Sequence, residues 1–380
     1  MHGRLAPPRK VPGSDFRLYH SSALEVLAGL LAEQVAELPV DGDWLRPDVV
    51  LVPQFSMRRW LQQVLAERLG ICANLKFLTP GEFVDFALDQ NLGPVPEADR
   101  LAPDTLRWHV LRELRSAPPA ALSDFVSGAD PLKAWSLANA LADSYEKYQA
   151  WRRDWLLDWE RTDQGRKPRA RSSADDWQAV LWRRIGRDRP HRARRIDDYL
   201  RRLHEPATPP VGLPPRLFVF ACQNISPDVL QVIASQAHAG SQHFFLHTPA
   251  RAFWGDLERW PDYTPGDDDA FLGGGDAPNP LLAAWGQAGR DFIAGLVGGE
   301  SVAPSFEAAP HPEPRDDTLL GHLQRAVLDN VDASVLATGA WPRAAVDRHD
   351  SSLQFHACHT RLREVQVLHC LLYTSPSPRD

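Results

Sequence analysis

The chain has 380 residues, of which 43% are hydrophobic, and this is enough for two or three globular domains with cores of ordinary size. No run of 18 uncharged apolar residues is present, and the first residues lack the apolar stretch of a secretory signal, so we expect no membrane contact and a cytoplasmic location. The cysteines are scattered without a short repeated spacing, which argues against a disulfide framework and a CxxC metal site (Cys72, Cys222, Cys358 and Cys370).

The net charge of −7 conceals an uneven distribution. Residues 151–204 carry 16 lysines and arginines against 9 acidic residues, whereas the rest of the chain is acidic. A basic segment of this kind suits an anionic partner. The alternative is an ordinary solvated surface in an arginine-rich protein, because only 5 of the 42 basic residues are lysines.

The first 90 residues predict the order strand, helix, strand, helix, helix. "RLYH" forms a short strand, and Ser21 or Ser22 can cap the helix that follows. "DVVLVP" is a continuous apolar strand of the kind buried in a parallel sheet, and the helix after it ends at Gly70. "TPGE" is a capping box with proline at the first helical position, so another helix begins near residue 80.

Helical periodicity predominates between about residues 90 and 205, which predicts a helical insertion. Three tryptophans at i, i+4 spacing either pack a helix into a core, the favoured interpretation, or form a platform for stacked bases (Trp151, Trp155 and Trp159). After the insertion we expect a strand at 217–221, a helix capped by Ser226, a strand at 243–250, an acidic loop at 259–281, helices at 280–297 and 316–331, and a strand at 352–360.

Common catalytic motifs are missing from the sequence. A phosphate loop of the form GxxxxGK[ST] would cradle ATP, but no lysine follows a glycine, and Cys222, Gln223 and Asn224 stand where a magnesium-binding acidic pair is expected. There is also no GxSxG elbow and no HExxH helix. Histidines and cysteines between 356 and 370 match no common zinc spacing. The sequence therefore predicts no catalytic residue and no metal ligand.

Several segments together resemble the N-terminal part of the RecC family. They are "LYHSSALEVLAGLLAE", "VLVPQFSMRRWLQ", "GICANLKFLTPGEF", "YQAWRRDWLLDWE", "GLPPRLFVFACQNISP", "NPLLAAWGQAGRDFI" and "FHACHTRLREVQVLH". The resemblance extends from about residue 16 to 369, in family order and with family-like spacing.

RecC is the gamma subunit of exodeoxyribonuclease V, the RecBCD helicase and nuclease. The resemblance implies an α/β fold like that of a superfamily 1 helicase whose ATP site has been lost. It also implies a heterotrimer with the RecB and RecD motor subunits, contact with single- and double-stranded DNA, and no cofactor in this chain, since ATP and Mg act in the partner subunits. The implied role is to guide DNA strands and recognise the Chi sequence during recombinational repair of double-strand breaks.

The resemblance also implies a domain organisation. The expected parts are a disordered extension at 1–14, a discontinuous helicase-like α/β domain at 15–90 and 205–335, a helical insertion at 91–204, and the truncated start of a second helicase-like domain at 350–369. The tail "CLLYTSPSPRD" from 370 to 380 resembles translated adapter or vector sequence, so we expect no functional residue there.

Four positions match the surface with which the family reads Chi. Asp143, Arg152 and Arg192 agree with the family pattern, and Glu146 replaces an aspartate. Arginine forks and carboxylates can read the edges of unpaired bases, so these residue types suit the task. The alternative is that Asp143 and Arg152 form ordinary surface ion pairs.

The segment "PQFSMRRW" departs from the family pattern, which has polar, amide-bearing side chains there. Phe55 can stack on a base or belong to the core, and Arg59 can hold a phosphate. Thr79 and Asp85 also stand where the family has apolar or aromatic residues. We therefore expect DNA binding with a changed or lost sequence preference.

A second class of function stays open at this point. The chain can be part of a catalytically active helicase-nuclease subunit of the AddB type, or of a metal-dependent nuclease. AddB-type chains carry a phosphate loop and iron–sulfur cysteines, which this portion lacks. Sequence beyond residue 369 would distinguish the two classes.

Overall fold

The structure is a computed structural model that describes residues 15–37, 45–96, 99–127, 131–161, 177–203, 209–251, 279–297, 304–331 and 347–374. The predicted extension at 1–14, most of the acidic loop at 259–281 and residues 162–176 of the basic segment 151–204 lie outside these residues. The chain divides into two compact units, and the first contains the residues up to Thr248 together with Ala288–His311. The second contains Pro249–Gln287 and Pro312–Asp380.

A parallel sheet of six strands organises the first unit, in the order β3-β2-β4-β5-β1-β6. Its strands are β1 (Phe16–Ser21), β2 (Asp48–Leu51), β3 (Leu75–Leu78), β4 (Arg216–Phe220), β5 (Ser241–His247) and β6 (Phe306–Ala308). The central strands β2 and β4 are buried throughout, as their unbroken apolar sequences predict. The predicted α/β fold with a parallel sheet is confirmed.

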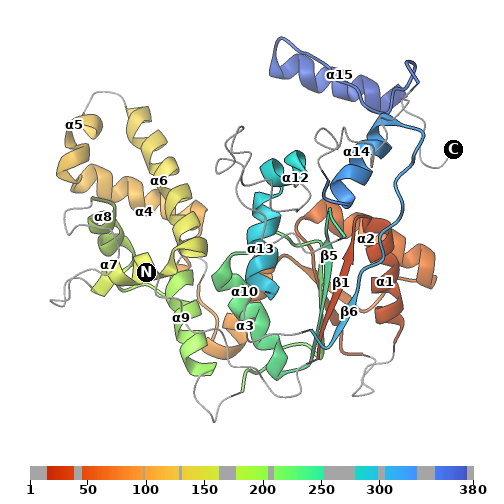
Figure 1. The fold of residues 1–380 in the computed structure, drawn as a ribbon. Coiled ribbons are helices and arrows are strands. Elements are labelled where there is room, and N and C mark those ends of the chain that lie inside the picture. The colour runs from red at the N-terminus through yellow and green to blue at the C-terminus, as the bar shows by residue number, and fades with distance from the viewer. Residues whose placement is uncertain are drawn as a thin grey trace, which may run out of the picture. The chain divides into compact units, whose positions relative to one another are not determined.

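Helices cover both faces of this sheet. On one face α1 (Leu24–Ala36) and α2 (Phe55–Leu69) bury Leu27, Leu31, Leu61 and Leu65 against strand residues such as Phe220. On the other face lie α3 (Pro80–Leu92) and α10 (Pro227–Ala234), as Figure 1 shows. Because side chains alternate along a strand, the fully buried strands β2 and β4 contribute side chains to both faces.

Two short strands of the sheet were not predicted. Strand β3 has the sequence "LKFL", and only Phe77 of it is buried, so neither strand periodicity nor a long apolar run reveals it. Strand β6 has three residues, pairs with β1 and has largely exposed side chains. Both lie at edges of the sheet, where tertiary pairing rather than local sequence creates the strand.

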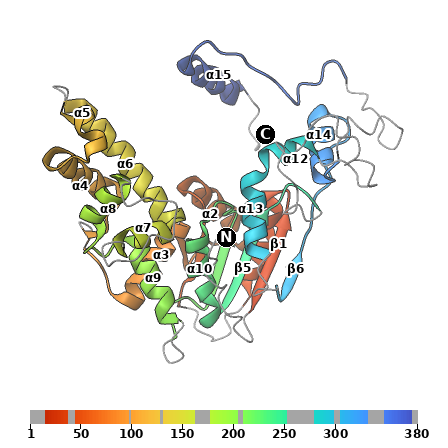
Figure 2. The same cartoon turned by 60° about the vertical axis from the view of Figure 1, so that its left-hand side comes forward.

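The described residues between β3 and β4 form a series of helices and no strand, as predicted. After α3 come α4 (Pro103–Ser116), the 3-10 helix η2 (Ala120–Leu122), α5 (Ser123–Val126), α6 (Pro131–Trp151), α7 (Arg153–Arg161), α8 (Trp177–Gly186) and α9 (Arg192–Leu203). A core of their own holds these helices together, and Leu106, Leu114, Tyr145 and Trp182 lie in it. Both ribbon views place α4–α8 beside the sheet-bearing part (Figures 1 and 2).

The three tryptophans of this segment do not share one helix. Helix α6 ends at Trp151 and α7 begins at Arg153, so the i, i+4 spacing is interrupted. Trp159 is buried in the helical core, Trp155 packs against that core, and Trp151 is exposed. The core-packing interpretation holds for Trp159 and Trp155 but is wrong for Trp151.

At α2 and α10 the predicted helix ends are correct, whereas at α1 the predicted cap is wrong. Gly70 ends α2 in the left-handed conformation, and Ser226 caps α10 by accepting a hydrogen bond from Val229 N, both as predicted. The predicted cap of α1 is wrong, because Ala23 is the N-cap residue and no side chain caps that helix. Ser21 Oγ instead accepts a hydrogen bond from Ala23 N at 3.2 Å.

The second unit contains α12 (Pro280–Trp285), α14 (Leu319–Leu328) and α15 (Arg361–Thr374) among its described residues. Helix α13 (Gln287–Val297) begins at the boundary, and the 3-10 helix η4 (Ser235–His238) belongs to the first unit. The predicted strand at 352–360 is wrong: this segment is irregular, and Phe355 is 90% exposed. A strand needs a neighbour, and no described strand pairs with it.

Candidate nucleic-acid interface

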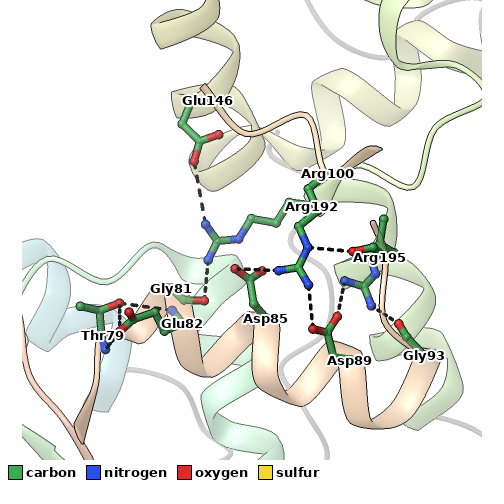
Figure 3. A network of polar contacts seen from close by, with 11 residues as sticks. Thr79, Gly81, Glu82, Asp85, Asp89, Gly93, Arg100, Glu146, Arg192 and Arg195 are labelled. Atoms are coloured by element: carbon green, nitrogen blue, oxygen red, sulfur yellow. Dashed lines mark hydrogen bonds and ion pairs between the residues drawn. The ribbon is translucent and has the colours of Figure 1, made fainter. Parts of the chain in front are cut away.

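Helix α3 begins with a complete capping box, as its sequence predicts. Thr79 Oγ1 accepts a hydrogen bond from Glu82 N at 3.2 Å, and the Glu82 carboxylate accepts one from Thr79 N at 2.7 Å (Figure 3). The two side chains satisfy backbone donors that the first helical turn leaves without partners. The hydroxyl of Thr79, a candidate DNA contact, thus also starts the helix.

Arg192, the first residue of α9, meets two other elements near this cap. Its guanidinium lies 3.9 Å from the Glu146 carboxylate of α6 and donates to Gly81 O at 3.3 Å (Figure 3). Burial raises the pKa of Glu146 above its ordinary value, the charge of Arg192 opposes this rise, and the nearby Asp85 adds to it. Both contacts of Arg192 are long, although its side chain is only 20% exposed.

Asp85 lies one turn into α3 and belongs to a stronger set of contacts, the α3–α9 network (Asp85, Asp89, Arg100, Arg192 and Arg195). Arg100 lies 4.0 Å from Asp85 and 2.9 Å from Asp89. Arg195 is buried and donates to Asp89 at 3.0 Å and to Gly93 O at 2.6 Å. Four candidate residues thus lie at or beside this network: Thr79, Asp85, Glu146 and Arg192.

Sequence reasoning missed Arg195 and Arg153 as positioning residues. Arg195 fastens α9 to α3, and the buried Arg153 pairs with Asp228 of α10 at 3.3 Å. A signal was available, since Arg195 falls on the same helical face as Ile196 and Tyr199, which are also buried. Charge counting alone does not separate inward from outward arginines.

Asp143 lies on α6, the helix that also carries Glu146, and Arg152 directly follows the end of that helix. Asp143 is exposed on α6, and no described residue forms an ion pair with it or with Arg152. Arg152 occupies the break between α6 and α7, where its side chain donates to Trp151 O at 2.9 Å and lies 5.4 Å from the centre of the Trp155 ring. The ion-pair alternative for these two residues is therefore wrong among the described residues.

Phe55 and Arg59 lie in the first two turns of α2, which follows strand β2. Phe55 is 67% exposed, so it is not a core residue, and Arg58 lies 5.9 Å from its ring centre. Arg59 is also exposed. Val52 N, just beyond β2, donates to Leu78 O at the end of β3, so the starts of α2 and α3 lie at the same edge of the sheet. Among the described residues, no hydrogen bond or ion pair joins Phe55 or Arg59 to Glu146 or Arg192.

The carboxyl edge of β1, β4 and β5 is occupied by hydrogen bonds within the protein. His247 Nε2 donates to Ser22 O at 3.0 Å, Thr248 N donates to Ser21 O at 2.8 Å, and Gln223 Nε2 donates to His247 O. Burial raises the pKa of the Cys222 thiol, which leaves it protonated and a poor nucleophile near neutral pH. In the described part of the chain, no group of three histidines, cysteines or acidic residues is arranged to hold a metal ion.

None of the described helices combines the length and apolarity needed to cross a bilayer.

Comparison with known proteins assigns the family. The family model described as "RecC, N-terminal domain" matches residues 16–330. The RecBCD enzyme subunit RecC of Escherichia coli (strain K12) is 29% identical over 416 residues, which cover 96% of this chain and 36% of that protein. RecC of Haemophilus influenzae is 27% identical, with 93% of this chain and 36% of that protein covered.

A third relative, RecC of Mycolicibacterium smegmatis, is 29% identical and covers 89% of this chain and 30% of its own length. The chain thus spans about a third of the curated relatives that it matches. Because the family model covers most of the chain, the chain belongs to the RecC N-terminal domain family.

Proposed function

We propose that this chain is the N-terminal, DNA-handling part of a RecC-type subunit. In this proposal it works in the cytoplasm with RecB and RecD motor subunits as a heterotrimer that processes double-strand breaks for repair by homologous recombination. The chain itself supplies no catalytic residue and no cofactor, and ATP and Mg act in the partner subunits. Family membership and the names of the relatives support this assignment.

The observation that carries the proposal is the exposed ring of Phe55 with two arginines beside it. Phe55 is 67% exposed at the start of α2, Arg58 lies 5.9 Å from its centre, and Arg59 is exposed one turn further along the helix. A base can stack on a solvent-facing ring of this kind. Guanidinium groups hold phosphates, so the combination fits single-stranded DNA.

The proposal includes recognition of Chi by the end of α6. Asp143 and Arg152 present an acceptor and a donor to solvent, and neither is committed to an ion pair with a described residue. Glu146 of α6 and Arg192 of α9 form a long ion pair of 3.9 Å that a base edge can replace. Such groups discriminate bases by their hydrogen-bonding edges.

The test of DNA binding is a fluorescence anisotropy titration of a labelled oligothymidine onto the full chain. Phe55→Ala should weaken binding about fivefold or more, because a stacked base contributes roughly 1–3 kcal/mol. Arg59→Ala should lower the slope of log K against log salt by about 0.7. Phe355→Ala is the matched control, since Phe355 is also an exposed phenylalanine (90%).

Unchanged affinity in Phe55→Ala would contradict this site. ATP hydrolysis by the chain alone would instead favour an active AddB-type subunit. Chi reading is tested by selecting binders from a random single-stranded library. Enrichment of a short motif by the native chain, and its loss in Arg152→Ala, is the expected result; no enrichment would remove Chi reading while leaving DNA binding intact.

A further inference from the structure

The outward face of α4 carries an exposed aromatic ring that the proposed site does not use. Trp108 is 60% exposed, although it lies 4.9 Å, centre to centre, from Trp135 of α6 at an interplanar angle of 45°. Trp135 is half-buried and packs against the helical core. The core thus holds Trp135, and Trp135 in turn supports one side of the Trp108 ring while the rest faces solvent.

Arginines continue this face toward the end of α4. Arg112 and Arg115 follow Trp108 by four and seven residues, which places them on the same side of the helix one and two turns away. The Arg112 side chain is 59% exposed and lies 3.4 Å from the Glu113 carboxylate. Arg115 is exposed, and no described side chain pairs with it.

Two further arginines lie near this face, and the acidic residues Asp104 and Glu113 lie on the same helix. Arg189 lies 2.8 Å from His109 Nε2, next to Trp108 in sequence, and Arg184 donates to Ala117 O just beyond the helix. Burial lowers the pKa of His109, and the charges of Arg189 and Arg112 lower it further. An exposed ring flanked by arginines matches the surface of proteins that bind single strands, which combine stacking rings with basic side chains.

We propose that the face formed by Trp108, Arg112 and Arg115 of α4 is a second contact for single-stranded DNA, on which a base stacks against Trp108 while the two arginines hold neighbouring phosphates. This deepens the proposed function and rests on it. The surface is nevertheless separate from the first: Trp135, which supports the ring, precedes Glu146 by eleven residues on α6, or about 16 Å along the helix.

Ultraviolet cross-linking locates the contact directly. The full chain is irradiated with an oligothymidine that carries 5-iodouracil, and the attached peptides are identified by mass spectrometry. We expect a cross-link on the peptide that contains Trp108. A parallel anisotropy titration compares the native chain with Trp108→Ala, Trp108→Phe and Arg115→Ala. The matched control is Trp285→Ala, because Trp285 is 82% exposed in α12.

Trp108→Ala should weaken binding about fivefold, and Trp108→Phe should retain most of the affinity because it keeps a stacking ring. Arg115→Ala should reduce the salt slope by about 0.7. Circular dichroism checks that each variant is folded.

If Phe55→Ala weakens binding while Trp108→Ala does not and no cross-link forms on α4, this inference is wrong and the proposed function stands; the face would then suit an acidic protein surface. If the folded native chain binds no single-stranded DNA, both fall. A Trp285→Ala loss equal to that of Trp108→Ala would show a general effect of exposed tryptophans and would also overturn the inference.

Discussion

Helices α4 and α9 both carry several arginines, yet the structure uses them in opposite ways. On α9, Arg195 and Arg202 donate to Asp89, Gly93 O and Asn91 O of the neighbouring α3 segment. On α4, Arg112 and Arg115 face solvent around the exposed Trp108. The helices differ in their neighbours: α9 lies against the acidic side chains and open carbonyls of α3, whereas the outer face of α4 meets the Trp135 ring of α6 and pairs Arg112 with Glu113 of α4 itself. A basic helix is therefore structural or available for binding according to what lies beside it.

The largest effect should come from breaking the buried contacts of α9. Arg195→Ala leaves Asp89 with one partner fewer and removes a donor from Gly93 O, which should lower the free energy of unfolding by about 3 kcal/mol. Urea denaturation measures this. Arg115→Ala on α4 is the matched control and should change stability by less than about 0.5 kcal/mol. Equal losses in the two variants would remove the distinction between these helices.

A drop in pH should change the stability contribution of His243 in the sheet without changing the charge of the arginines, because arginine stays protonated throughout the pH range tested. Burial lowers the pKa of His243 in β5 to about 4, with the charge of Arg17 adding to the effect. The unfolded chain binds a proton near pH 6.5 and the folded chain only near 4, so this histidine's contribution is complete above about 6.5 and is lost as pH falls toward 4.

The loss should reach roughly 3 kcal/mol across that window. Urea midpoints at several pH values measure it, and His243→Gln should flatten the profile between pH 6.5 and 4 while Arg195→Ala shifts it without changing its shape. A native profile that is already flat in this window would contradict the buried, neutral histidine.

A smaller effect is expected at the start of α3, the helix that receives the α9 arginines. Thr79→Ala removes the capping hydroxyl and should cost about 1 kcal/mol, whereas Thr79→Ser keeps it and should cost little. Thermal unfolding of the three chains gives the comparison. If Thr79→Ser were as unstable as Thr79→Ala, the methyl group rather than the cap would explain the loss.

The smallest effect is expected for Glu146, which pairs with Arg192 of the α3–α9 network. Burial raises the pKa of Glu146, so its negative charge is unfavourable in the folded protein at neutral pH despite Arg192 at 3.9 Å. A carboxyl of this kind favours the folded state below the unfolded pKa of about 4.5 and loses that contribution as pH rises. Glu146→Gln should therefore leave stability at pH 7 unchanged within about 0.5 kcal/mol or raise it slightly.

Chemical denaturation at pH 7 tests this prediction. A loss of more than 1 kcal/mol would mean that the Glu146–Arg192 pair supports the fold, and Arg192 would then be as structural as Arg195. If stability is retained, DNA binding by the same variant reports on base contacts rather than on folding.

The sequence by itself determined the parallel strands β1, β2, β4 and β5, the capping box at Thr79, the end of α2 at Gly70 and the helical nature of the insertion. These features depend on local periodicity and on residues with a single favoured backbone role, so a short window of sequence contains the information. The family resemblance and the eight candidate site residues also came from the sequence.

Only the tertiary structure decided the rest. Strands β3 and β6 exist because a neighbouring strand pairs with them, and the segment at 352–360 has strand-like sequence but no described partner. The exposure of Phe55, Trp151 and Trp108 was equally hidden in the sequence, and so was the partner of the buried Arg195. The exposure of a side chain depends on which distant segments pack against it, and a short window of sequence does not contain those segments.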